Sequence, residues 1–116
     1  MAKDNGHPQA TISTHVLDTE RGVPAAGVHV TLYRIDVGVD RPVRMTQALT
    51  DGDGRVGDLL ERPLRAGDYR LEFEIGQDDG SFFTKLAIDF TITDIGRSYH
   101  VPLLLAPYSM TTYRGS

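Results

Sequence analysis

The sequence predicts an all-β domain, folded as an antiparallel β-sandwich of seven to eight strands. Short stretches in which apolar and polar residues alternate recur along the chain, and clusters of turn residues separate them at intervals of about 8–12 residues. No stretch carries a long apolar repeat of helical period. Alternation with one polar face is typical of antiparallel sheets, and many short strands of this kind favour a sandwich.

The length of 116 residues fits a single domain. We expect a flexible leader over residues 1–9, which are polar, and a sandwich domain over residues 10–116. The first strand begins at Ala10 and places His15 opposite its core face, which is formed by Ile12, Thr14 and Val16.

The other strands follow from the same alternation and from the turns between them. The second expected strand has its core face at Val28, Val30 and Leu32, and a tight turn over residues 51–54 precedes a short strand. A loop over residues 76–81 holds at most one helical turn. The expected strands cover residues 28–35, 43–50, 56–60, 69–75 and 86–92, followed by two C-terminal runs on either side of Pro107, Tyr108 and Ser109.

Composition excludes several classes of protein. The net charge of -4 disfavours a nucleic-acid partner, which usually requires a basic excess. The absence of cysteine excludes disulfides, thiolate metal sites and a cysteine nucleophile. No apolar run approaches the length of a membrane span, and the first residues lack the apolar segment of a secretory signal. We therefore expect a cytoplasmic protein without a membrane partner.

Two histidines and one arginine are candidates for chemistry. His15 and His100 carry the side chain best suited to general base catalysis near neutral pH. Arg55 follows the tight turn, and its guanidinium can hold a planar anionic or carbonyl-rich ligand by paired hydrogen bonds. From residue type alone, a structural role at the surface is the more common one for each of the three. Residue types and spacing alone name no reaction, because no nucleophile elbow, phosphate loop or dinucleotide fingerprint is present.

Metal sites are not expected. His7 and His29 complete the set of four histidines, which lack the spacings of zinc ligands. Asp51 and Asp53 resemble the start of a calcium loop, but Arg55 occupies a position that needs an oxygen ligand. We expect a tight turn here.

The last residues, Tyr113-Arg114-Gly115-Ser116, gather a phenol, a guanidinium and a hydroxyl within four positions. Taken alone, they are as consistent with a frayed tail as with a functional segment.

Four separated motifs in order resemble the transthyretin-related proteins, and the terminal tetrapeptide resembles that of the 5-hydroxyisourate hydrolases in particular. The resemblance extends over residues 11–116 and implies a transthyretin-like (prealbumin-like) sandwich. The motifs are Ile12-Ser13-Thr14-His15-Val16-Leu17-Asp18-Thr19 with Gly22 to Val28, Thr50-Asp51-Gly52-Asp53-Gly54-Arg55, Tyr99-His100-Val101-Pro102-Leu103-Leu104-Leu105, and Tyr113-Arg114-Gly115-Ser116.

The resemblance implies hydrolysis of 5-hydroxyisourate to 2-oxo-4-hydroxy-4-carboxy-5-ureidoimidazoline in urate breakdown, without a cofactor or metal. It implies catalytic roles for His15, His100 and Ser116, with the choice of base and acid open. Substrate binding would fall to Arg55, Tyr113, Arg114 and Gly115. The resemblance also implies a homotetramer, built as a dimer of dimers, with the active sites in a channel between subunits. Members of the family usually carry a short helix between the strands expected at residues 69–75 and 86–92, where this chain has only residues 76–83.

Two other functions stay open. A transthyretin-like carrier would bind an apolar ligand in the same channel, without needing two histidines and arginines there. A structural sandwich module would not need a fixed C-terminal segment.

Overall fold

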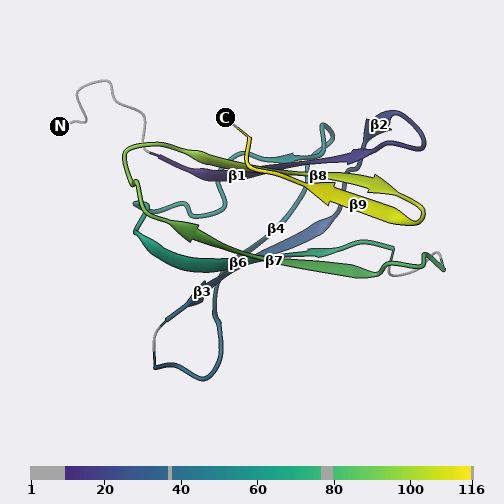
Figure 1. The fold of residues 1–116 in the computed structure, drawn as a ribbon. Coiled ribbons are helices and arrows are strands. Elements are labelled where there is room, and N and C mark those ends of the chain that lie inside the picture. Colours follow the sequence, from purple (N-terminus) through teal and green to yellow (C-terminus); the bar gives the residue numbers. More distant parts are fainter. Residues whose placement is uncertain (1–9, 37, 77–79, 116) are drawn as a thin grey trace.

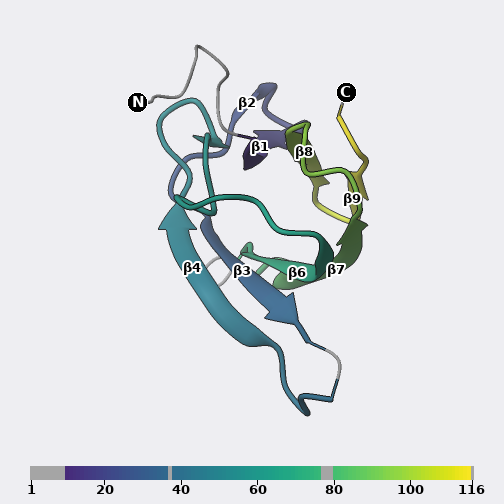
Figure 2. The ribbon, with the colours of Figure 1, turned by 90° about the vertical axis from the view of Figure 1, so that its left-hand side faces the viewer.

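Two β-sheets packed face to face make up the structure, a computed structural model that describes residues 10–36, 38–76 and 80–115 (Figures 1 and 2). Over these ranges the chain is all-β and has no helix, as expected. Two strands have only two residues, which leaves seven longer ones. The strands are β1 Ile12–Asp18, β2 Val23–Pro24, β3 His29–Ile35, β4 Val43–Leu49, β5 Arg55–Val56, β6 Gly67–Glu74, β7 Lys85–Ile92, β8 Tyr99–Ala106 and β9 Ser109–Thr112.

The first sheet has the order β2-β1-β8-β9, and β5 also pairs with β1; the second has the order β4-β3-β6-β7. The pair β1–β8 is parallel over its whole length, from Ile12 opposite Tyr99 to Asp18 opposite Leu105. The expectation of a purely antiparallel sandwich is therefore wrong for this pair. A parallel pair needs a long crossover connection, and here the strands of the second sheet lie within that connection. Local alternation of apolar and polar residues does not reveal such a pairing.

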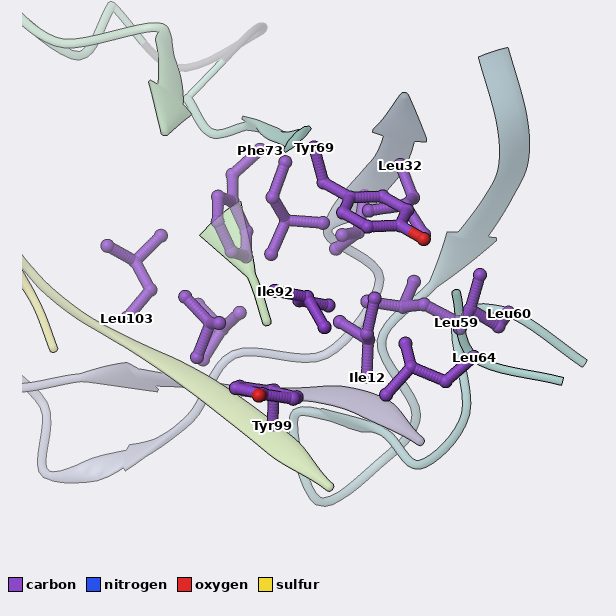
Figure 3. Close-up of a cluster of buried hydrophobic side chains, with 14 of the residues drawn as sticks. Ile12, Leu32, Leu59, Leu60, Leu64, Tyr69, Phe73, Ile92, Tyr99 and Leu103 are labelled. Atoms are coloured by element: carbon purple, nitrogen blue, oxygen red, sulfur yellow. The ribbon is translucent and has the colours of Figure 1, made fainter. Parts of the chain in front are cut away.

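The core fills the space between the sheets (Figure 3). Ile12 and Val16 from β1 meet Leu32, Leu71 and Phe73 from the second sheet, and all five side chains are buried. This burial follows the predicted alternation, because successive side chains of a strand point to opposite faces.

The expected strand over residues 56–60 is wrong beyond Val56, because β5 ends there. Leu59 and Leu60 are consecutive and both 1% exposed, whereas a strand would turn one of them outward. An irregular backbone lets both enter the core, and the Leu59 N–H donates to the Ile12 carbonyl at 2.8 Å. Between β6 and β7, the described residues 75–76 and 80–84 contain no helix.

The outer face of the first sheet is the face that matters for the site. Since Thr14 and Val16 point into the sandwich, Ser13 and His15 point away from it. On β8, Val101 is buried and His100 lies on the outer face. The expected leader over residues 1–9 and residue Ser116 lie outside the described ranges.

Candidate active site

The parallel register of β1 and β8 brings the two candidate histidines to adjacent strands. Ser13 lies opposite His100, and His15 lies two residues further along the same face of β1. A hydrogen bond of 2.8 Å joins Ser13 Oγ to His100 Nδ1. The two histidines are thus neighbours on the outer face, although most of the sequence separates them.

Ser13 is a site residue that the sequence analysis missed. Its alternation with His15 placed it on the right face, but nothing in the sequence states which residue of β8 lies opposite. A parallel pairing between strands so distant leaves no local pattern to find.

The turn before β5 places Arg55 beside His15. The Asp51 carboxylate accepts hydrogen bonds from the backbone N–H groups of Arg55, at 3.0 Å, and Asp53, at 2.8 Å. The hydrogen bond from the Arg55 N–H is the largest cause that lowers the pKa of Asp51. The tight turn expected at Asp51 is confirmed, because this carboxylate closes the turn.

Gly54 fastens that turn to β1. The Val16 N–H donates to the Gly54 carbonyl at 2.7 Å, and Gly54 has φ of 76°. A Cβ at this position would lie 2.4 Å from the Val16 carbonyl oxygen, so only glycine allows the approach. Arg55 then lies opposite His15 in the antiparallel pairing of β5 with β1. Its side chain is exposed, and within the described ranges no carboxylate pairs with its guanidinium.

The segment after β9, yellow in Figure 1, lies beside β8. The Gly115 N–H donates to the His100 carbonyl at 2.7 Å, as an isolated antiparallel bridge. A Cβ on residue 115 would lie 2.8 Å from His100 Cδ2. The backbone therefore reaches the imidazole because the residue is glycine.

Tyr113 and Arg114 lie elsewhere. They line a cavity of about 230 Å³ whose other walls include Ile88 and Phe90 of β7, at the open edge between the sheets. Neither histidine lines this cavity. The structure thus gathers His15, Arg55, His100 and Gly115, and leaves Tyr113 and Arg114 to one side.

Burial lowers the pKa of His100 below its ordinary value, and electrostatic interactions with Arg55 and His15 lower it further. His100 is accordingly neutral at neutral pH. A neutral imidazole has one nitrogen with a proton and one without, so it can accept a proton or donate a hydrogen bond. With a guanidinium close by, the group can move protons and steady a developing negative charge.

The remaining histidines do not join this group. His29 is exposed on the outer face of the second sheet, and His7 lies outside the described ranges. In the part of the chain that the structure describes, no three His, Asp or Glu side chains are grouped as metal ligands. The same residues contain no helix long and apolar enough to span a membrane.

Comparisons with known proteins agree with this architecture. The chain folds as a transthyretin-like sandwich, and the sequence model of the HIUase/Transthyretin family matches residues 12–115. The chain belongs to that family. A Deinococcus radiodurans protein named 5-hydroxyisourate hydrolase is 43% identical over 122 residues, which cover 97% of this chain and 99% of the relative.

Two solved structures have a similar fold. The 5-hydroxyisourate hydrolase of Klebsiella pneumoniae has a TM-score of 0.79 and 38% identity, over 93% of this chain and 100% of that one. Sea bream transthyretin in complex with thyroxine has a TM-score of 0.81 and 26% identity, over 91% and 95% of the two chains. Both branches of the family therefore share the architecture.

Proposed function

We propose that this protein hydrolyses 5-hydroxyisourate and opens its ring to give 2-oxo-4-hydroxy-4-carboxy-5-ureidoimidazoline. The observation that carries the proposal is the convergence of His15, His100 and Arg55 on one face of the first sheet. The relatives from Deinococcus radiodurans and Klebsiella pneumoniae bear the name of this activity. Cytoplasmic location stays a prediction from the sequence.

The reaction needs three things from the protein. Water attacks a ring carbonyl carbon and loses a proton to a base, and the new oxyanion needs a donor. When the tetrahedral intermediate collapses, the C–N bond breaks and the leaving nitrogen takes up a proton. Water therefore supplies both the new C–O bond and the protons, and no oxidant or reductant takes part.

The described residues suit these needs. His15 and His100 exchange the protons, and burial keeps the imidazole of His100 neutral and ready to accept one. Arg55 holds the carbonyl edge of the substrate and steadies the oxyanion, since its guanidinium has no carboxylate partner in the described ranges. Ser116 is assigned a relay of protons, and Tyr113, Arg114 and Gly115 the shaping of the site, from the sequence resemblance.

We also propose a homotetramer, built as a dimer of dimers, with the sites between subunits. Leu17 and Leu104 are neighbours in the register of β1 and β8, and neither packs against the core. Two apolar side chains on the face that carries the site favour a second subunit over that face.

A carrier of small apolar ligands is the alternative, favoured by the similarity to a transthyretin that binds thyroxine. Two imidazoles and a guanidinium on one face are better explained by proton transfer than by an apolar ligand.

The experiment is the ultraviolet decay of freshly generated 5-hydroxyisourate. Wild type and the control variant His29→Asn should accelerate it equally, since His29 is exposed on the far sheet. His15→Asn should lose about 10²-fold or more in rate, the scale of losing a general base. Decay at the uncatalysed rate with wild type would refute the hydrolase and leave the carrier.

A further inference from the structure

The imidazole of His100 is contacted on two sides. Ser13 Oγ lies 2.8 Å from Nδ1, and Gly115 lies so close to the ring that a Cβ there would come within 2.8 Å of Cδ2 and 3.3 Å of Cγ. Within the described ranges, Nε2 has no hydrogen-bond partner. Ser13 thus occupies Nδ1 of the ring, and Nε2 is left open.

Ser13 differs chemically from the partner that histidines often have in active sites. A carboxylate on Nδ1 would favour the imidazolium and raise the pKa of the ring. A hydroxyl is neutral and serves as donor or acceptor. It accepts from Nδ1–H when the ring is protonated and donates to Nδ1 when the proton is on Nε2, so the bond persists through a proton-transfer cycle.

We propose that Ser13 is a positioning residue, whose hydroxyl holds His100 by Nδ1 so that Nε2 faces the substrate in both protonation states of the ring. This inference rests on the proposed hydrolase function and gives Ser13, which stands in the first motif of the resemblance, a role that the resemblance did not assign.

The charges around His100 agree with a neutral tether. After burial, electrostatic interactions with Arg55 from β5 and His15 from β1 lower its pKa. Gly115 brings no charge to the ring, although Arg114 precedes it in the same segment. Ser13 orients the ring without cancelling these effects.

The test compares Ser13→Ala, Ser13→Thr and a matched control, Ser98→Ala. Ser98 Oγ accepts a hydrogen bond of 3.0 Å from the Thr11 N–H, so it also ties the start of β1 to the start of β8, but it does not touch His100. Ser13→Ala should lower kcat by about 10-fold with little change in KM, since a hydrogen bond that orients the ring is lost. Ser13→Thr keeps the hydroxyl and should restore most of kcat, and Ser98→Ala should match wild type.

A second measurement does not depend on turnover. In nitrogen-15 NMR spectra of the labelled protein, the Nδ1 chemical shift of His100 should change in Ser13→Ala and stay unchanged in Ser98→Ala. If wild type does not turn over 5-hydroxyisourate, the proposed function fails while this spectrum still tests the tether. An unchanged Nδ1 shift in Ser13→Ala, or equal losses of kcat in Ser13→Ala and Ser98→Ala, would overturn the assignment of Ser13.

Discussion

Arg55 depends on geometry as much as on charge. The closed turn at Asp51 and the attachment of Gly54 to β1 fix its backbone beside His15. Its side chain stays exposed, so the fold does not need it.

We expect Arg55→Lys to lose about 10²-fold in kcat/KM, because the point charge of an ammonium cannot reproduce two parallel hydrogen bonds to a carbonyl edge. Steady-state kinetics with 5-hydroxyisourate measures the loss, and circular dichroism should show an unchanged fold. Arg62→Lys is the matched control, since Arg62 is also exposed and lies outside the site. Turnover near the wild-type value in Arg55→Lys would return this arginine to a surface role.

His100 should also influence stability. Its pKa is lowered in the folded state, so between that pKa and the unfolded value of roughly 6.5 the unfolded chain binds more protons. Stability therefore falls as pH drops below roughly 6.5 and is regained above it. The lowered pKa values of Asp51 and Asp89 act at lower pH, below roughly 4, and do not interfere.

The measurement is the thermal midpoint between pH 7.5 and 5. His100→Gln should lose less stability over this range than wild type, because the group that resists protonation is gone. His29→Gln should keep the wild-type dependence. Parallel losses in wild type and His100→Gln would contradict the prediction.

At the scale of elements, the segment after β9 is the most sensitive to change. Gly115 bonds to the backbone of His100, so residues added to this segment start close to the imidazole. A C-terminal hexahistidine tag, or deletion of Tyr113 to Ser116, should leave a folded sandwich whose activity is down by at least ~10²-fold. The same tag at Met1 should be harmless.

Sizing, circular dichroism and substrate decay should be compared for the two tagged proteins. Equal turnover from them would mean that the C-terminal tetrapeptide plays no part in catalysis.

A single methyl group tests the same segment more finely. Gly115→Ala places a Cβ 2.8 Å from His100 Cδ2, closer than side chains approach, so either the ring or the segment must move. We expect a loss of kcat of about 10-fold or more with an unchanged thermal midpoint, since the contact is at the surface of the sheet. Gly57→Ala, at a position where a Cβ meets nothing within 4 Å, is the control. Full activity in Gly115→Ala would show that the ring is not held by this contact.

The elements also show what the sequence could predict. Alternation located β1 and β6 because their residues alternate between buried and more exposed positions. It also located β3, although Thr31 on the outer face of that strand is buried between Val30 and Leu32. It failed at Leu59 and Leu60, where an irregular segment buries two successive side chains. His15, His100 and Arg55 were found by residue type and resemblance. Ser13 was not found, because its importance comes from its position opposite His100 on β8.

At the scale of the whole molecule, the outer face of the first sheet should be an interface. We expect light scattering to give the mass of a tetramer, and Leu104→Asp to reduce it, because a charge would enter an apolar contact. Leu49→Asp, at a site 55% exposed on the other sheet, should leave the mass unchanged. A fully active monomer at assay concentration would refute the shared site.

The pairing of β1 with β8 has a consequence for the order of folding. Ser13 and His100 are 87 residues apart, so the strand that carries one histidine is synthesised long before the strand that carries the other. Until then, Ile12 and Val16 on β1 lack their partners on β8, Tyr99 and Leu103. Contacts of such long range form slowly, because the entropy of closing the loop is lost before the contact is gained. The strands of the second sheet pair across shorter stretches of chain than β1 and β8, so this sheet should form first. The site should be the last part of the protein to assemble.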